Sequence, residues 1–186
     1  MTTTSNDAQI VKSKGFFTPI RISRMAILIA LSVVGAFIKV PTPTGDAGLD
    51  SVPAYFAAMM KKWDWKEAAV IAVLARLLAA AVVGFPLGIV IQLILGISNA
   101  SWVAVVARLA RLRFGFIAAI VATEIWAVGV SLGGGPALYI LGFGMDYPAA
   151  FALSLAGLPG LLVAAGLAVV IAVAAAKALD NTALNK

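Results

Sequence analysis

Residues 26–58 read AILIALSVVGAFIKVPTPTGDAGLDSVPAYFAA, and this stretch decides the fold. A long apolar run ends near Val40. A segment rich in Pro and Gly follows at residues 41–50, and after it comes an apolar segment of only about ten residues, 51–60, which as a helix would rise about 15 Å, half of a bilayer core. Irregular backbone at membrane depth persists only where protein or water satisfies its hydrogen bonds. We therefore expect residues 41–50 to dip into the protein or to roof a cavity.

The composition of the whole chain indicates that lipid is its main solvent. Hydrophobic residues make up 62% of the sequence and charged residues 12%, with a mean hydropathy of +1.04. A soluble domain needs far more charge to cover its surface. The chain has no Cys and no His, which removes thiol chemistry and the commonest general base and metal ligand, and its few acids do not cluster in sequence. We expect a membrane protein that is not an enzyme and that carries no cofactor or metal.

Six apolar segments follow one another along the chain, at residues 22–40, 51–60, 65–83, 87–107, 114–132 and 149–177. All but the second are long enough to cross a bilayer, which takes roughly 20 helical residues. The sequence thus predicts an all-α integral membrane protein with six transmembrane helices, the second one short. The membrane domain would span residues 21–178, between cytoplasmic tails at 1–20 and 179–186.

The distribution of Lys and Arg predicts the orientation. Six crossings would place twelve of the 14 basic residues on one side: Lys12, Lys14, Arg21, Arg24, Lys61, Lys62, Lys66, Arg108, Arg111, Arg113, Lys177 and Lys186. The opposite loops, 41–50, 84–86 and 133–148, contain no Lys or Arg. Because Lys and Arg concentrate in cytoplasmic loops, we expect both termini to be cytoplasmic in a multi-pass protein of the cytoplasmic (inner) cell membrane.

Two ionisable residues lie well inside apolar segments, Arg76 and Glu124. Such residues face a partner or a wet cavity, so either the two pair with each other or they contact a ligand. Gln92 and Asn99 are seven positions apart and share one helix face. Gln92 lies just beyond the turn signal GFPLG at residues 84–88, which favours a cavity role. Asn99 either joins that cavity or hydrogen-bonds a neighbouring helix.

The outer loops supply the other candidate ligand-binding residues. Lys39 borders the first loop and either faces the site or snorkels outward. Asp50 closes that loop and can cap the second helix, as can Ser51. Phe85 lies in GFPLG. The third loop, 133–148, is either functional or part of an interfacial aromatic belt, and it holds Tyr139, Phe143 and Tyr147.

Ala26 and Ala30 give the first helix an A-x-x-x-A spacing, which lets another helix approach closely. Alone this motif is weak, because alanine is abundant in the chain. It marks a candidate close-packing face of this helix.

The stretch 26–58, together with GFPLG before a helix that bears Gln92, resembles the substrate-binding S component of an energy-coupling factor (ECF) transporter, an ABC-type vitamin importer. The resemblance covers roughly residues 20–178 and is strongest in GAFIK-P-x-P-T-G, LDS-x-P-x-YFAA and GFPLG. It is most similar to the branch linked to cobalamin or to precursors such as α-ribazole.

The resemblance implies high-affinity uptake of a vitamin that is bound beneath the outer loops. It also implies docking on a membrane scaffold subunit, the T component, through the small-residue face of the first three helices, with Ala26 and Ala30 as docking residues, and two cytoplasmic ATPases that drive transport. The alternatives are a stand-alone small-solute membrane transporter and a non-catalytic membrane assembly factor.

Overall fold

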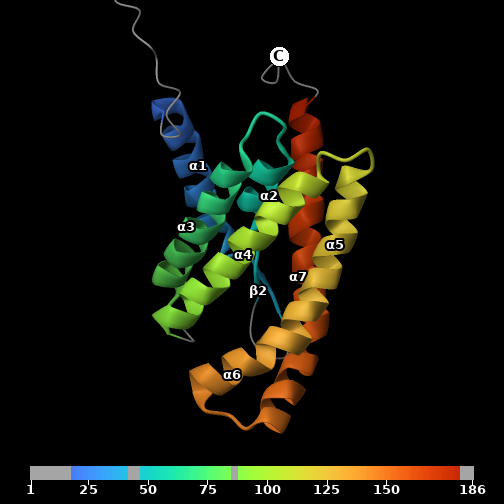
Figure 1. The fold of residues 1–186 in the computed structure, drawn as a ribbon. Helices are drawn as coiled ribbons and strands as arrows, with labels where there is room; N and C mark the ends of the chain where they lie inside the picture. Colours follow the sequence, from blue (N-terminus) through green and yellow to red (C-terminus); the bar gives the residue numbers. More distant parts are fainter. Residues whose placement is uncertain (1–17, 42–46, 85–87, 181–186) are drawn as a thin grey trace, which may run out of the picture.

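A bundle of helices makes up this computed structural model, which describes residues 18–41, 47–84 and 88–180 (Figure 1). The elements in chain order are α1 (Pro19–Gly35), β1 (Lys39–Val40), β2 (Ala47–Gly48), α2 (Val52–Met59), α3 (Trp65–Val83), α4 (Ile89–Leu109), α5 (Gly115–Gly129), the π-helical turn η1 (Val130–Gly134), α6 (Gly135–Phe143) and α7 (Tyr147–Asp180). The two short strands pair antiparallel, with Lys39 opposite Gly48. The predicted all-α architecture is confirmed, with this small hairpin added.

The observed helix bounds agree best with the predicted segments at α3, whose start has a capping box. The third predicted segment, 65–83, is confirmed to the residue by α3. Asp64 precedes it, and its carboxylate accepts a hydrogen bond from the backbone N–H of Lys66 at 3.2 Å, while Glu67 reaches back to the N–H of Asp64 at 3.3 Å. This reciprocal capping satisfies N–H groups that a helix start leaves free. α1 ends earlier than expected, at Gly35, where the chain turns into the hairpin.

The segment predicted as the third outer loop is helical over much of its length. Residues 133–148 were expected to form a loop, but α5 continues through η1 into α6, and only three residues separate α6 from α7. Ser131 of η1 donates a hydrogen bond to the carbonyl of Ser154 on α7 at 2.8 Å. This packing against α7 overrides the low helix propensity of the three consecutive glycines, and Pro136 is tolerated in the first turn of α6.

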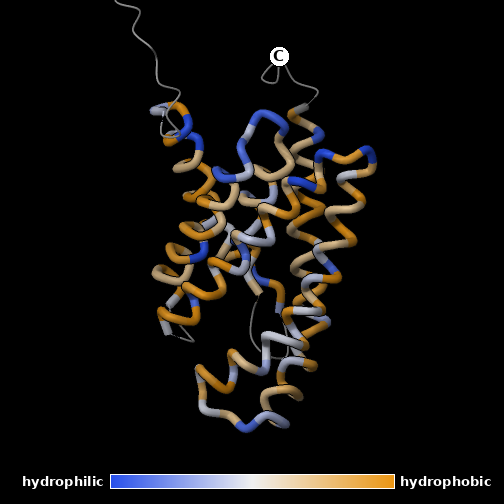
Figure 2. Tube along the Cα trace, in the orientation of Figure 1, coloured by the Kyte–Doolittle hydropathy of each residue, from blue (hydrophilic) through white to orange (hydrophobic). Residues whose placement is uncertain are grey.

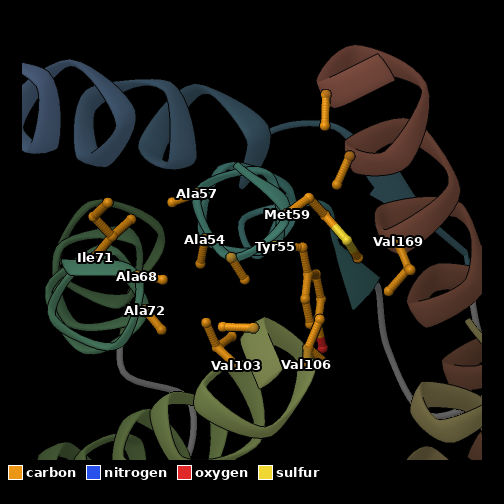
Figure 3. Close-up of a cluster of buried hydrophobic side chains, with 14 of the residues drawn as sticks. Ala54, Tyr55, Ala57, Met59, Ala68, Ile71, Ala72, Val103, Val106 and Val169 are labelled. Atoms are coloured by element: carbon orange, nitrogen blue, oxygen red, sulfur yellow. The ribbon is translucent and has the colours of Figure 1, made fainter. Parts of the chain in front are cut away.

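The short helix α2 lies at the centre of the bundle. Figure 3 shows it enclosed by α1, α3, α4 and α7, with Tyr55 directed toward α4 and Met59 toward α7. Ala54 and Ala57 are fully or almost fully buried, which lets the neighbouring helices approach closely. A helix of eight residues is therefore stabilised here by the protein around it. Residues 42–46 of the preceding segment lie outside the described residues.

Close backbone contacts hold the hairpin against the end of α1. The N–H of Leu49 donates to the carbonyl of Gly35 at 3.1 Å. A Cβ atom at Gly35 would lie 2.7 Å from the carbonyl oxygen of Leu49, so only glycine fits. Ser51 occupies the N-cap of α2 without a side-chain hydrogen bond, and Asp50 points elsewhere, so the predicted cap is wrong.

One end of the molecule is basic. Figure 1 shows that the start of α1, the α2–α3 connection, the α4–α5 connection and the end of α7 lie together at the top of the view, and Figure 2 shows hydrophilic residues gathered there. We call this the basic end. Its described Lys and Arg residues are Arg21, Arg24, Lys61, Lys62, Lys66, Arg108, Arg111, Arg113 and Lys177. The α3–α4 connection, α6 and the start of α7 lie at the opposite end.

Three of the described helical stretches are long and apolar enough to cross a membrane: Ile89–Leu109, Gly115–Phe143 and Tyr147–Leu179. α1 has 17 residues and α2 only eight, and α3 carries Lys66, Glu67 and Arg76. Length and composition therefore support a membrane protein and three spans. The full set of six crossings stays a prediction.

Candidate functional site

Three of the predicted ligand-binding residues meet in one place. The Nη1 atom of Arg76 on α3 lies 3.1 Å from the Oδ2 atom of Asp50. The Nε–H of Arg76 donates to the Oε1 atom of Gln92 on α4 at 3.1 Å. Asp50 and Gln92 are buried, whereas the Arg76 side chain is 35% exposed. We call these three residues the polar cluster. They come from separate parts of the sequence, and only the fold brings them together.

The packing of α4 on α3 positions two of these residues. Gln92 and Gly96 are four positions apart and lie on the same face of α4. At Gly96 a Cβ atom would be in van der Waals contact with the Cα of Val73 and the Cβ of Arg76, at 3.8 and 3.9 Å. This close approach of the two helices brings the Gln92 amide within reach of the guanidinium.

The β1–β2 hairpin positions Asp50, the third residue of the polar cluster. Gly48 packs against the backbone of Ala36, where an added Cβ atom would lie 3.3 Å from the carbonyl oxygen. Leu49 is held by the carbonyls of Gly35 and Ile38. These contacts fix the chain just before α2 and direct the carboxylate of Asp50 toward α3.

The polar cluster has hydrogen-bonding capacity left over. A guanidinium carries five N–H donors in a planar fork, and the described contacts use those of Nε and Nη1. The remaining donors of Arg76 and its exposed fraction make it able to donate to a carbonyl, hydroxyl or anionic oxygen. The Asp50 carboxylate compensates the charge of Arg76, so the site is better suited to a neutral polar ligand than to a multiply charged anion. The same ion pair also fastens the start of α2 to α3, a structural role that needs no ligand.

The possible pairing of Arg76 with Glu124 is contradicted by the structure. Glu124 was expected either to pair with Arg76 or to contact ligand, but the ion pair of Arg76 is with Asp50. Glu124 instead lies against α7, where a Cβ atom at Gly166 would fall 2.6 Å from its Oε1 atom. Glycine at this position leaves room for the carboxyl group between α5 and α7.

The aromatic candidates lie apart from the polar cluster. Tyr139 and Phe143 stack on α6 with ring centroids 6.2 Å apart, and Tyr147 stacks on Phe151 at the start of α7 at 6.0 Å. Phe143 and Tyr147 are largely exposed. α6 packs on η1 and α7, so these rings form an aromatic group at the end of the molecule opposite the basic end.

The remaining candidates are placed individually. Lys39 is exposed on β1. Asn99 is half-buried on α4, about two turns nearer the basic end than Gln92. Phe85 lies outside the described residues. Ala26 and Ala30 are exposed on α1 beside Ile27, which is also exposed, so this face is free for a partner in the described structure.

Glu67, a buried acidic residue at the basic end, was not among the residues predicted from the sequence. Glu67 is fully buried, and both its carboxylate oxygens accept hydrogen bonds from Arg24 of α1, while the Nε of Arg21 lies 3.3 Å away. The Arg24 guanidinium also lies 4.3 Å from the ring centroid of Trp63. The D-x-x-E spacing of Asp64 and Glu67 is a capping-box signal that points to Glu67, but the ion pairs with α1 depend on tertiary packing.

No family model matches the chain, and comparison with the curated proteins found no match.

Proposed function

We propose that the protein is the substrate-binding membrane subunit of an ECF-type ABC transporter, with six crossings and both termini in the cytoplasm. Its ligand would be a vitamin or vitamin precursor, with cobalamin or α-ribazole the best candidates. The polar cluster is the observation that carries this proposal. It places a partly exposed guanidinium with free donors next to a buried carboxylate and a buried amide, inside a bundle whose buried residues are mostly apolar. Polar groups of this kind at membrane depth are costly and typically mark solute sites.

The fold supports the proposed orientation. The four segments that carry most of the Lys and Arg residues lie at the same end of the molecule. A cytoplasmic basic end follows the charge bias of membrane proteins, and it places the aromatic group of Tyr139, Phe143 and Tyr147 at the outer surface. The polar cluster then lies on the outer side of α2, because Asp50 precedes a helix that runs toward the basic end.

The neutral balance of charge in the polar cluster bears on the ligand class. Arg76 and Asp50 cancel each other's charge, and Gln92 adds an amide. A ligand rich in hydroxyl, carbonyl or ring nitrogen atoms would exchange hydrogen bonds with all three without leaving a buried charge unpaired. A nucleoside-like vitamin precursor such as α-ribazole has this chemistry.

The experiment is to purify the full chain from its native membrane in mild detergent and to identify by mass spectrometry what accompanies it. We expect a small aromatic nucleoside-like or corrin-containing molecule, together with one membrane scaffold subunit and two ATPase subunits. A protein that retains a small solute but never co-purifies with ATPases would instead be a stand-alone transporter. A protein with neither a solute nor ATPases would contradict the proposed function.

A further inference from the structure

A hollow of about 420 Å³ opens at the basic end, beneath the α4–α5 connection. Four basic side chains from three segments line it. Lys61 comes from the α2–α3 connection, Arg111 and Arg113 from the α4–α5 connection, and Lys177 from the last turns of α7. We call it the basic hollow. All four side chains are exposed, and its lining residues include no Asp or Glu.

Several contacts hold these charges in place around the hollow. An Nη2 atom of Arg111 donates to the carbonyl of Trp63 at 3.3 Å. The Nζ atom of Lys177 lies 5.2 Å from the ring centroid of Phe116, within the range of a cation–π contact. These contacts use one donor or none of each group, and they bring no negative charge. Because no Asp or Glu lines the basic hollow, its positive potential would favour an anion.

The rim of the basic hollow is apolar as well as charged. Phe114 is 69% exposed and Ile117 is 64% exposed, and Leu112 beside them is also exposed. Large apolar side chains next to a cation cluster at the end of a membrane helix are suited to the boundary between headgroups and acyl chains. A soluble anion would use the charges and leave these three side chains in water.

We propose that the basic hollow binds the phosphate of an anionic phospholipid, whose acyl chains lie against Phe114, Ile117 and Leu112. Basic pockets between helices at the cytoplasmic side of membrane proteins suit such headgroups, because that leaflet carries anionic lipid. The proposal needs the basic end to face a membrane surface. It does not depend on the solute that the protein carries.

The test is a lipid titration of the purified full chain in detergent, read by native mass spectrometry. The probes are dioleoylphosphatidylglycerol and dioleoylphosphatidylcholine, which have the same acyl chains and differ in net charge. One variant combines Arg111→Gln, Arg113→Gln and Lys177→Gln. A matched control combines Lys62→Gln, Lys66→Gln and Arg108→Gln, which remove the same charge from the basic end outside the hollow.

The parent should prefer the anionic lipid, and the hollow variant should bind it at least about tenfold more weakly, since each basic side chain near a lipid surface contributes about a factor of five. The control should keep the preference of the parent. Arg113→Gln alone should weaken binding about fivefold. Its only described contact is with the neighbouring Phe114, so this variant keeps the test valid if the triple variant does not fold.

Two results would overturn the proposal. Equal losses in the hollow variant and the control would mean that the charge of the whole end attracts the lipid without a site. Displacement of the anionic lipid from the parent by millimolar sn-glycerol 3-phosphate would mean that the hollow binds a soluble phosphate and that its apolar rim plays no part.

Discussion

The guanidinium of Arg76 lies 3.1 Å from the carboxylate of Asp50, which joins the middle of α3 to the residue just before the start of α2. Gln92 supports the same guanidinium from α4 through its Nε–H. The three side chains come from separate segments of a bundle whose described buried residues are mostly apolar. This arrangement gives Arg76 a fixed orientation while leaving part of it exposed, as a ligand-binding donor requires.

The ion pair predicts a specific energetic coupling. A double-mutant cycle with Arg76→Gln and Asp50→Asn should give a coupling of about 1.5–3 kcal/mol in the free energy of unfolding, the range for hydrogen bonds to charged groups. Denaturant unfolding of the purified protein in detergent measures it. A cycle of Arg76→Gln with Glu124→Gln is the control and should show no coupling. Stronger coupling to Glu124 than to Asp50 would contradict the observed pairing.

Neutralising Glu67 and neutralising Glu124 should lower the free energy of unfolding by different amounts. Glu67→Gln removes the carboxylate that accepts from Arg24 and pairs with Arg21, and losing hydrogen bonds to a charged group costs about 1.5–3 kcal/mol. Glu124→Gln should change the free energy of unfolding by less than about 1 kcal/mol, because no described ion pair involves Glu124 and the amide fits the same space beside Gly166. Denaturant unfolding of the two variants measures which substitution costs more. A larger loss for Glu124→Gln would show that this carboxylate has a partner of its own.

The proposed orientation can be tested with single cysteines, because the chain contains none. Arg111 at the basic end and Leu141 on α6 are both exposed. On intact cells, an impermeant maleimide should label Leu141→Cys and should label Arg111→Cys only after the cells are opened. The opposite pattern would invert the orientation. Labelling of both on intact cells would mean that the stretch from α5 to α6 does not cross the membrane.

The exposed face of α1 is expected to dock the scaffold subunit. Ala26→Trp combined with Ala30→Trp should hold a partner helix away and abolish co-purification of the ATPase module, while the isolated protein still binds its ligand. Val163→Trp with Leu167→Trp is the matched control, since both residues are exposed on α7 with the same spacing. Loss of the module in the control, or loss of ligand binding in the α1 variant, would contradict the assignment of this face.

Sequence patterns predicted the elements whose signals are local. The bounds of α3 match those of the apolar segment 65–83, and the shortness of α2 follows from the distance between the Pro- and Gly-rich segment and Lys61. The spacing of Lys and Arg along the chain predicted which connections share an end of the molecule. These properties need no knowledge of which helix packs on which.

What the sequence could not supply is the choice of partners across helices. Asp50 was predicted both as a cap and as a ligand contact, and its actual partner, Arg76, depends on the hairpin packing against α1 and on Gly96 at the α3–α4 contact. The glycines at 133–135 indicate a turn, yet packing on α7 makes them helical. The pairing of Glu67 with Arg21 and Arg24 likewise depends on how α1 lies on α3.

The most direct test of the central claim is equilibrium binding of α-ribazole and cobalamin to the purified protein, the Arg76→Gln and Gln92→Leu variants and an Arg108→Gln control. Thermal unfolding checks that each is folded. The parent should bind at least one of the two molecules. Arg76→Gln and Gln92→Leu should each weaken binding about tenfold to a hundredfold, the effect of a lost buried hydrogen bond, and Arg108→Gln should bind like the parent. Folded Arg76→Gln and Gln92→Leu proteins that bind as tightly as the parent, or a parent that binds neither molecule, would contradict the account.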